Sequence, residues 1–85
     1  MNFEIGKIVE YNNKVGYIVT SSGDKYLFIE KDMDDDVRIN DVVVFRPESI
    51  ENIKRAFFIK NMDNYLHENE EFSVELKTYI KKTEQ

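Results

Sequence analysis

The chain has 85 residues, of which 41% are hydrophobic and 13% aromatic, enough for one small globular domain and too few for two. Seventeen acidic residues against twelve basic ones give a formal net charge of -5, which argues against a domain that holds duplex DNA by phosphate contacts alone. The absence of cysteine excludes disulfides and thiolate metal sites. Because no apolar run resembles a signal peptide or a membrane span, we expect a cytoplasmic protein without a membrane partner.

The residues from 6 to 19 predict an antiparallel hairpin. Apolar and outward residues alternate on both sides of the turn sequence Asn12-Asn13-Lys14, which is the pattern of two strands with one buried face. We therefore expect strands at residues 1–11 and 15–20. Gly6 interrupts the alternation of the first strand, which indicates a bulge or a close approach of two backbones.

The alternation also assigns the side chains of this hairpin to two faces. Ile8 and Ile18 are predicted to point inward, whereas Val15 and Tyr17 are predicted to point outward. Outward Val and Tyr allow two interpretations. They are either ordinary surface residues of a strand, or part of a platform on which flat ligands such as nucleobases stack.

A third strand is predicted at residues 25–30, after a compact turn that contains serine and glycine. We assign Leu27 and Ile29 to the core, and the alternation then places Tyr26 and Phe28 on the outward face. An open aromatic platform is one interpretation of these side chains. The other is ordinary strand packing beneath a C-terminal helix.

The polar and acidic residues 31–40 lack strand or helix periodicity and predict a surface loop, with Val37 and Ile39 as its anchors. The loop contains a group of aspartates, which are Asp32, Asp34, Asp35 and Asp36. Such a group could bind a hard cation or dock a partner. The spacing lacks the regular ligands and closing Glu of a calcium loop, so we favour a solvated negative surface without a metal.

Two further strands are predicted at residues 42–45 and 54–60, separated by a loop. The first is nearly continuously apolar, as in a strand covered on both sides, and Pro47 is expected to end its pairing. The second contains the neighbours Phe57 and Phe58, and the alternation of a strand predicts that their side chains lie on opposite faces. One of these two rings must then be covered by something outside the barrel.

The last residues change from strand to helix periodicity. A helix is predicted at residues 71–82, because large apolar residues recur at the spacing i, i+4, i+7 and i+8, namely Phe72, Leu76, Tyr79 and Ile80. We expect residues 1–62 to form the barrel domain and residues 63–85 to form a C-terminal extension. The apolar stripe of this helix needs a surface, either the outward Phe of the fifth strand or a second copy of the chain in a homodimer.

Five short strands with a glycine-interrupted first hairpin predict an all-β fold, a small five-stranded barrel of the oligonucleotide- and oligosaccharide-binding (OB) type with a C-terminal helical appendage. Over residues 5–61 the sequence resembles a cold-shock domain. Residues 6–12 follow that family's motif G-x-V-K-W-F-N, and residues 14–18 follow K-G-F-G-F-I in shortened form. Residues 27–31 are matched to the motif D-V-F-V-H-F. The later motifs are matched by residues 37–45 and 56–59.

The resemblance implies a protein that binds single-stranded RNA or DNA by stacking bases on outward aromatic residues. Lys14, Tyr17 and Phe28 match positions at which cold-shock domains contact nucleic acid. Glu10 stands in place of the family's exposed Trp and Glu30 in place of its His, so we expect weak, sequence-tolerant binding. The face assignment adds Lys7 and Tyr26, and Lys31 is added as a lysine expected to border the aromatic residues. The candidate nucleic-acid-binding set is therefore Lys7, Lys14, Tyr17, Tyr26, Phe28 and Lys31.

The alternative hypothesis is a protein-binding or dimerisation module on the same barrel, with a degenerate nucleic-acid surface. An enzyme is not indicated, because the sequence has no nucleophile elbow, phosphate-binding glycine loop or zinc-binding helix motif. His67 is the one histidine of the chain and is accompanied by no cysteine, so we favour an exposed side chain over a catalytic or metal-binding role. We therefore expect no catalytic residues and no cofactor.

Overall fold

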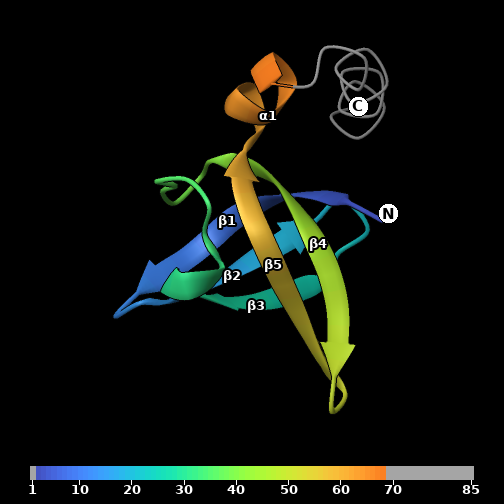
Figure 1. The fold of residues 1–85 in the computed structure, drawn as a ribbon. Coiled ribbons are helices and arrows are strands. Elements are labelled where there is room, and N and C mark those ends of the chain that lie inside the picture. Colours follow the sequence, from blue (N-terminus) through green and yellow to red (C-terminus); the bar gives the residue numbers. More distant parts are fainter. Residues whose placement is uncertain (1, 69–85) are drawn as a thin grey trace.

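The computed structural model describes residues 2–68, which form a closed five-stranded barrel with a helix after its last strand (Figure 1). Its elements are β1 (Glu4–Asn12), β2 (Val15–Thr20), β3 (Lys25–Ile29), the 3-10 helix η1 (Glu30–Asp32), β4 (Val42–Ile50), β5 (Ile53–Asn61) and α1 (Met62–Glu68). Around the barrel the strands follow the order β1-β2-β3-β5-β4, and every neighbouring pair is antiparallel except β3 with β5. This confirms the predicted all-β, OB-type barrel. The predicted helix at residues 71–82 lies outside the described residues.

Two tight turns close the hairpins β1–β2 and β4–β5. In the first, Asn13 and Lys14 have φ angles of 53° and 69°, the left-handed values that a two-residue type I′ turn requires. In the second, Glu51 and Asn52 have φ angles of 52° and 67°. The first turn lies where the sequence predicts it. The second is shorter than the predicted loop, because β4 and β5 continue to pair almost to its tip.

A bulge in β1 turns two consecutive side chains outward. The Cα pairs pass from Ile8↔Ile18 directly to Glu10↔Tyr17, which leaves Val9 without a partner on β2. Val9 and Glu10 are consequently both exposed, while Ile8 and Ile18 are buried as predicted. The bulge increases the local twist of β1, which helps this short sheet to close into a barrel.

Two glycines lie where a neighbouring group leaves no room for a side chain. A Cβ atom on Gly6 would lie 3.0 Å from the carbonyl oxygen of Val19, so this residue allows the close approach of β1 and β2. A Cβ atom on Gly16 would lie 2.5 Å from the carbonyl oxygen of Glu10 and 2.6 Å from Cε1 of Phe28. Gly16 therefore makes the space in which the Phe28 ring packs.

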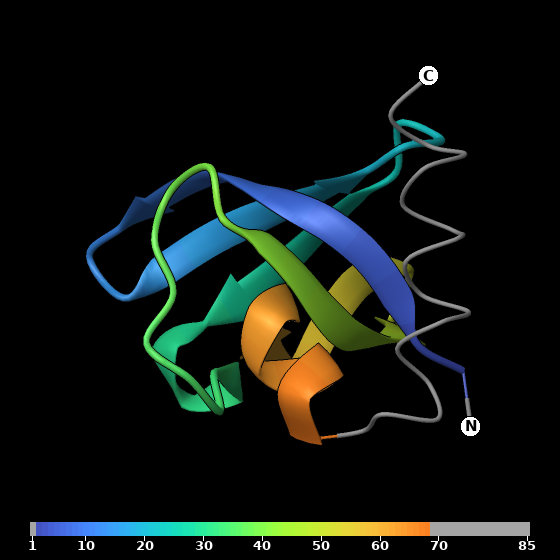
Figure 2. The same ribbon diagram turned by 90° about the horizontal axis from the view of Figure 1, so that it is seen from above.

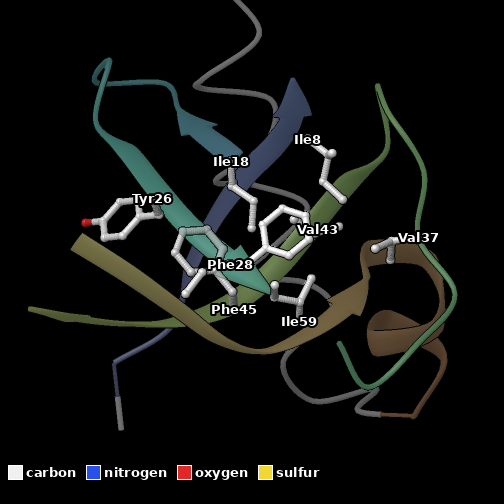
Figure 3. Packing of buried hydrophobic residues seen from close by; sticks show 9 residues of the cluster. Ile8, Ile18, Tyr26, Phe28, Val37, Val43, Phe45 and Ile59 are labelled. Atoms are coloured by element: carbon white, nitrogen blue, oxygen red, sulfur yellow. The ribbon is translucent and has the colours of Figure 1, made fainter. Parts of the chain in front are cut away.

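The main core fills the barrel, and a smaller cluster lies beside α1. Figure 3 shows the main cluster, in which side chains from every strand converge. Its members are Ile8, Ile18, Tyr26, Phe28, Val37, Val43, Phe45, Ala56 and Ile59. The second cluster consists of Ile5, Val44, Met62 and Tyr65. Tyr65 lies beyond the predicted domain boundary at residue 62, so part of the predicted extension packs on the barrel.

The two faces of β3 are reversed relative to the prediction. Tyr26 and Phe28 point into the core, with 7% and 0% of their surface exposed, and Figure 3 shows both rings inside the barrel. Leu27 and Ile29 are half-buried on the outer side instead. The assignment of Tyr26 and Phe28 to an outward platform is therefore wrong.

The pairing of β3 with β2 explains this reversal. Phe28 is the Cα partner of Gly16, and Tyr26 is the Cα partner of Ile18. Directly paired residues of antiparallel strands project on the same face, which here is the core face of Ile18. The Phe28 ring fills the space that Gly16 leaves, and the Tyr26 ring packs against Phe45 with centroids 5.0 Å apart.

The acidic loop after β3 is fastened to the barrel at several points. Asp32 accepts hydrogen bonds from the backbone N–H of Ile29 and from Arg55, both at 2.9 Å. Asp35 accepts one from the backbone N–H of Asn61, also at 2.9 Å. Two of the clustered aspartates therefore hold the loop in place by satisfying backbone and side-chain donors of the barrel.

One of the two predicted anchors of this loop is confirmed. Val37 is buried in the main core, whereas Ile39 is exposed, so the prediction for Ile39 is wrong. The loop also pairs with the barrel at a single bridge between Met33 and Ile59. Within residues 2–68, no three His, Cys, Asp or Glu side chains lie together in an arrangement that could hold a metal ion.

Strand β4 continues through Pro47 to Ile50, so the predicted end of this strand is wrong. Its pairing with β1 stops at Glu4↔Phe45, whereas its pairing with β5 continues through Pro47↔Ala56. Beyond Phe45, β5 is the one strand that pairs with β4 in the described part of the chain, and a proline without an N–H is tolerated where a strand has a free edge. The hairpin of β4 and β5 consequently projects beyond the rest of the barrel (Figure 1).

A bulge in β5 keeps both phenylalanines out of the core. The Cα pairs pass from Val44↔Lys60 to Arg46↔Phe57, so β5 contains one residue more than β4 over this stretch. Phe58 takes the extra position with a φ angle of 51°, and its ring is exposed. Phe57 is half-buried outside the core, so the prediction that the two rings lie on opposite faces is wrong.

Helix α1 follows β5 directly and packs against one end of the barrel, as the view in Figure 2 shows. Met62 and Tyr65 are its buried residues in the part whose side chains are described, and they contact the cluster around Ile5 and Val44. The Tyr65 ring also lies 5.9 Å from that of Phe3, measured between centroids. Among residues 2–68, no helix has the length and apolar character needed to span a membrane.

Candidate nucleic-acid interface

The outer face of β1, β2 and β3 is a regular array of side chains that the strand register fixes. Each row crosses the three strands, because directly paired residues project on the same side of a sheet. The three rows, written from β1 to β3, are Lys7-Val19-Lys25, Glu10-Tyr17-Leu27 and Asn12-Val15-Ile29. We call this array the β1–β3 face.

Tyr17 lies at the centre of the β1–β3 face. It is half-buried, with Glu10 as its partner on β1 and Leu27 as its partner on β3. The ammonium group of Lys25 lies 4.3 Å from the centroid of the Tyr17 ring, within the range of a cation–π contact. The β1–β3 face therefore combines one flat ring with an adjacent exposed cation, the two kinds of group that contact a base and a phosphate.

Further lysines lie at the margins of this face. Lys7 is exposed in the first row, and Lys14 is exposed in the turn between β1 and β2. The carbonyl oxygen of Lys14 accepts a hydrogen bond of 2.9 Å from the backbone N–H of Glu30, which fastens that turn to the end of β3. Lys31 follows in η1 and is also exposed. Phosphates bound here would meet these lysines, but also the carboxylates of Glu10 and Glu30.

Comparisons with known proteins bear on the fold. No family model matches the chain, and no curated protein sequence matches it significantly. Among solved structures, the CSD456 structure of Drosophila Unr, which contains cold-shock domains, superposes with a TM-score of 0.63 and 22% sequence identity. The described barrel has the cold-shock fold. The match covers 72% of this chain and 27% of the Unr chain.

In this cold-shock fold, the structure brings together only part of the predicted binding set. Lys7, Lys14 and Tyr17 lie on or beside the β1–β3 face, and Lys31 lies just beyond the end of β3. Tyr26 and Phe28 do not, because both are buried in the core. They cannot stack on a base while the barrel is folded.

The reversed faces of β3 also shift the match of this strand to the cold-shock motif D-V-F-V-H-F by one residue. Leu27 and Ile29, rather than Phe28 and Glu30, occupy its outward positions, so aliphatic side chains stand where the motif has Phe and His. Among the outward residues of β1, β2 and β3, all of which the structure describes, Tyr17 is the only aromatic one. The aromatic surface is thus smaller than the sequence predicts.

Lys25 is a member of this face that the predicted set omits. It pairs with Val19 and reaches over the ring of Tyr17. The correct alternation of β3 would have identified it, because Lys25 lies two residues before Leu27 and so projects on the same side.

Proposed function

We propose that the β1–β3 face binds single-stranded nucleic acid, either RNA or single-stranded DNA, weakly and with little sequence preference. The observation that carries this proposal is the half-buried Tyr17 ring at the centre of the face, with the ammonium group of Lys25 4.3 Å from its centroid. A cold-shock fold supports nucleic-acid binding in general, by analogy between folds. The proposed activity is binding without catalysis, and we place it in the cytoplasm.

In the proposed complex, a base stacks on the Tyr17 ring. Lys25 is exposed and flexible, so its ammonium group moves from the ring to the phosphate that follows the stacked base. Val15, Leu27 and Ile29 offer apolar contact to neighbouring bases. Because stacking and apolar contact suit every base, little sequence preference is expected.

The composition of this face also limits the affinity. Stacking on one aromatic ring contributes roughly 1 to 3 kcal/mol per base, whereas a dissociation constant of 1 μM requires about 8 kcal/mol. We therefore expect a dissociation constant in the micromolar range or weaker. If Lys7, Lys14 and Lys25 each neutralise a phosphate, the logarithm of the affinity falls with the logarithm of salt concentration with a slope of roughly -2.

Tyr17→Ala is expected to weaken binding of labelled oligo-U and oligo-dT by about five-fold or more at low salt, because it removes the stacking surface. Tyr17→Phe keeps the ring and is expected to bind like the unmodified protein. Tyr17→Leu is the control that keeps an apolar side chain without a ring, and it should bind like Tyr17→Ala. Fluorescence anisotropy measures the dissociation constants of the unmodified protein and the three variants. Equal affinities of Tyr17→Ala and the unmodified protein would contradict the proposal.

A second candidate function is protein binding through the same face. The observation that favours it is the aliphatic character of Val15, Leu27 and Ile29 around Tyr17, since aliphatic residues suit a protein partner better than a base. Dimerisation through residues 71–82 is a further form of this hypothesis, and it concerns residues outside the described part of the chain. Sedimentation velocity at high protein concentration, with and without oligonucleotide, separates self-association from nucleic-acid binding.

A further inference from the structure

A second surface of the barrel, formed by β4, β5, α1 and the residues before β1, is hollowed into a pocket of about 290 Å³. Its lining residues are Phe3, Arg46, Phe58, Lys60 and Tyr65. None of them belongs to the β1–β3 face, so this pocket is separate from the proposed nucleic-acid site. Three aromatic rings and two cationic side chains make it an apolar hollow with positive charge beside it.

Phe58 lines this pocket with an exposed ring and an unfavourable backbone conformation. Its surface is 52% exposed and its backbone has a φ angle of 51°, in the left-handed region that bulky residues rarely adopt. An exposed ring in a strained backbone position costs stability unless it contacts something else. A phenylalanine at this bulge is therefore best explained by an occupant that covers its ring.

The polar groups at the pocket indicate an acidic occupant. The guanidinium of Arg46 lies 4.9 Å from the centroid of the Phe58 ring, and Lys60 lines the same hollow. One nitrogen of Arg46 donates to Glu48, but its Nε is buried and has no hydrogen-bond partner among residues 2–68. A carboxylate beside the pocket would complement both cations and provide an acceptor for Arg46.

We propose that the occupant is the chain's own C-terminal segment, residues 69–85. This segment begins with the acidic residues Glu70 and Glu71, followed by the apolar residues Phe72, Leu76, Tyr79 and Ile80 with Glu75 among them; its second half also carries Lys77, Lys81 and Lys82. Its apolar side chains suit the aromatic hollow, and its carboxylates suit Arg46 and Lys60. The first half of the segment, residues 69–76, combines glutamates with large apolar anchors and is the complement of this pocket in both respects.

The tether to the pocket is short. The segment continues from α1, which ends at Glu68, and Tyr65 of α1 lines the pocket itself. Phe72 follows Glu68 by four residues, which span at most about 14 Å when extended. Covalent attachment at this distance gives a millimolar effective concentration, so even a weak contact would be populated. The segment would cover the Phe58 side of the barrel and leave the β1–β3 face open.

The absence of cysteine allows a direct test in the full chain. A nitroxide spin label is attached at Glu75→Cys, and paramagnetic broadening of backbone amide signals is measured by NMR. We expect the signals of Phe58, Lys60 and Tyr65 to lose most of their intensity, and those of Val15 and Tyr17 to keep it. Leu76→Asp in the labelled chain is expected to restore the lost signals, because it removes an apolar anchor.

Two results of this measurement would overturn the proposal. One is full intensity at Phe58 and Lys60 in the labelled chain. The other is broadening that appears when spin-labelled chains without nitrogen-15 are mixed with unlabelled nitrogen-15 chains, because the occupant is then a second copy. Neither result depends on nucleic acid, so the proposed function is tested separately.

The sign of a stability change provides a second test. If residues 69–85 cover Phe58, Phe58→Gly should lower the thermal midpoint of the full chain by about 5 °C or more. If the ring stays in water, glycine should keep or raise the midpoint, because it adopts positive φ without strain. Glu51→Gly is the matched control, because Glu51 is exposed with a φ angle of 52° in the turn between β4 and β5. It should not lower the midpoint, and a Phe58→Gly variant that behaves like it would refute the proposal.

Discussion

Phe28→Ala is expected to destabilise the barrel by about 3 to 5 kcal/mol, because it removes a large ring from a packed core. Phe28 is fully buried, and its ring stacks on that of Tyr11 with centroids 5.7 Å apart. Since small domains are stable by only about 5 to 15 kcal/mol in total, much of this variant should be unfolded at 37 °C. Urea denaturation followed by circular dichroism measures the loss.

Leu27→Ala is the matched control on the same strand. Its side chain is half-buried on the outer face, so we expect a loss of about 1 kcal/mol or less. A Phe28→Ala variant as stable as Leu27→Ala would show that Phe28 faces outward after all. That result would also return Phe28 to the set of residues that could stack on bases.

Gly16→Ala is expected to cost roughly 1 to 3 kcal/mol or more, although it adds only one methyl group. The new Cβ atom would lie 2.5 Å from the carbonyl oxygen of Glu10 and 2.6 Å from Cε1 of Phe28. A backbone carbonyl in a paired strand and a ring in the core cannot both move aside cheaply. Thermal and urea denaturation measure the change.

A double-mutant cycle gives the control for this prediction. Phe28→Leu shortens the side chain beside Gly16, so part of the cost of Gly16→Ala should disappear in the double variant. We expect a favourable coupling of about 0.5 kcal/mol or more between the two substitutions. Strictly additive effects would mean that the Phe28 ring does not occupy the space above Gly16.

The first hairpin could be predicted from the sequence because two alternating stretches flank a turn-forming segment. Ile8 and Ile18 are buried as the alternation predicts, although the outward residues of β2 are apolar as well, and Asn13 tolerates the positive φ angle of the turn. Local chemistry therefore predicts the turn and the alternation on both sides of it. The bulge at Val9 could not be placed, since it depends on the register between two strands.

The inward and outward faces of strand β3 could not be assigned by alternation alone, because both faces are apolar. Tyr26 and Phe28 form one face and Leu27 and Ile29 the other, and periodicity does not choose between them. The deciding residue lies on another strand. Gly16 shares a face with Ile18, and a glycine on the core face leaves a space that a large ring can fill.

The second hairpin departs from the prediction for a similar reason. The extra residue at Phe58 changes the alternation of β5, so that Ala56 and Ile59 are both buried although they are three residues apart. Likewise, Pro47 can continue β4 because β1 has already separated from it. Both features depend on contacts between distant segments, which a local pattern does not contain.

The candidate site could be predicted in its location but only partly in its residues. Lys7, Lys14 and Tyr17 lie on the first hairpin, whose faces the sequence determines, and all three lie at the β1–β3 face. The residues that β3 contributes were assigned to the wrong side. With that correction, Lys25 joins the site and the stacking surface is reduced to a single ring.

The most direct test of nucleic-acid binding is an NMR titration of the unmodified protein with oligo-U at low salt, observed on backbone amide signals. The proposed function predicts saturable shifts at Lys7, Tyr17 and Leu27, with signals of the pocket residues Phe58 and Lys60 unchanged. The same experiment with Tyr17→Ala should give much smaller shifts at the same concentrations. Absence of shifts on the β1–β3 face at millimolar oligo-U, or shifts confined to Phe58 and Lys60, would contradict it.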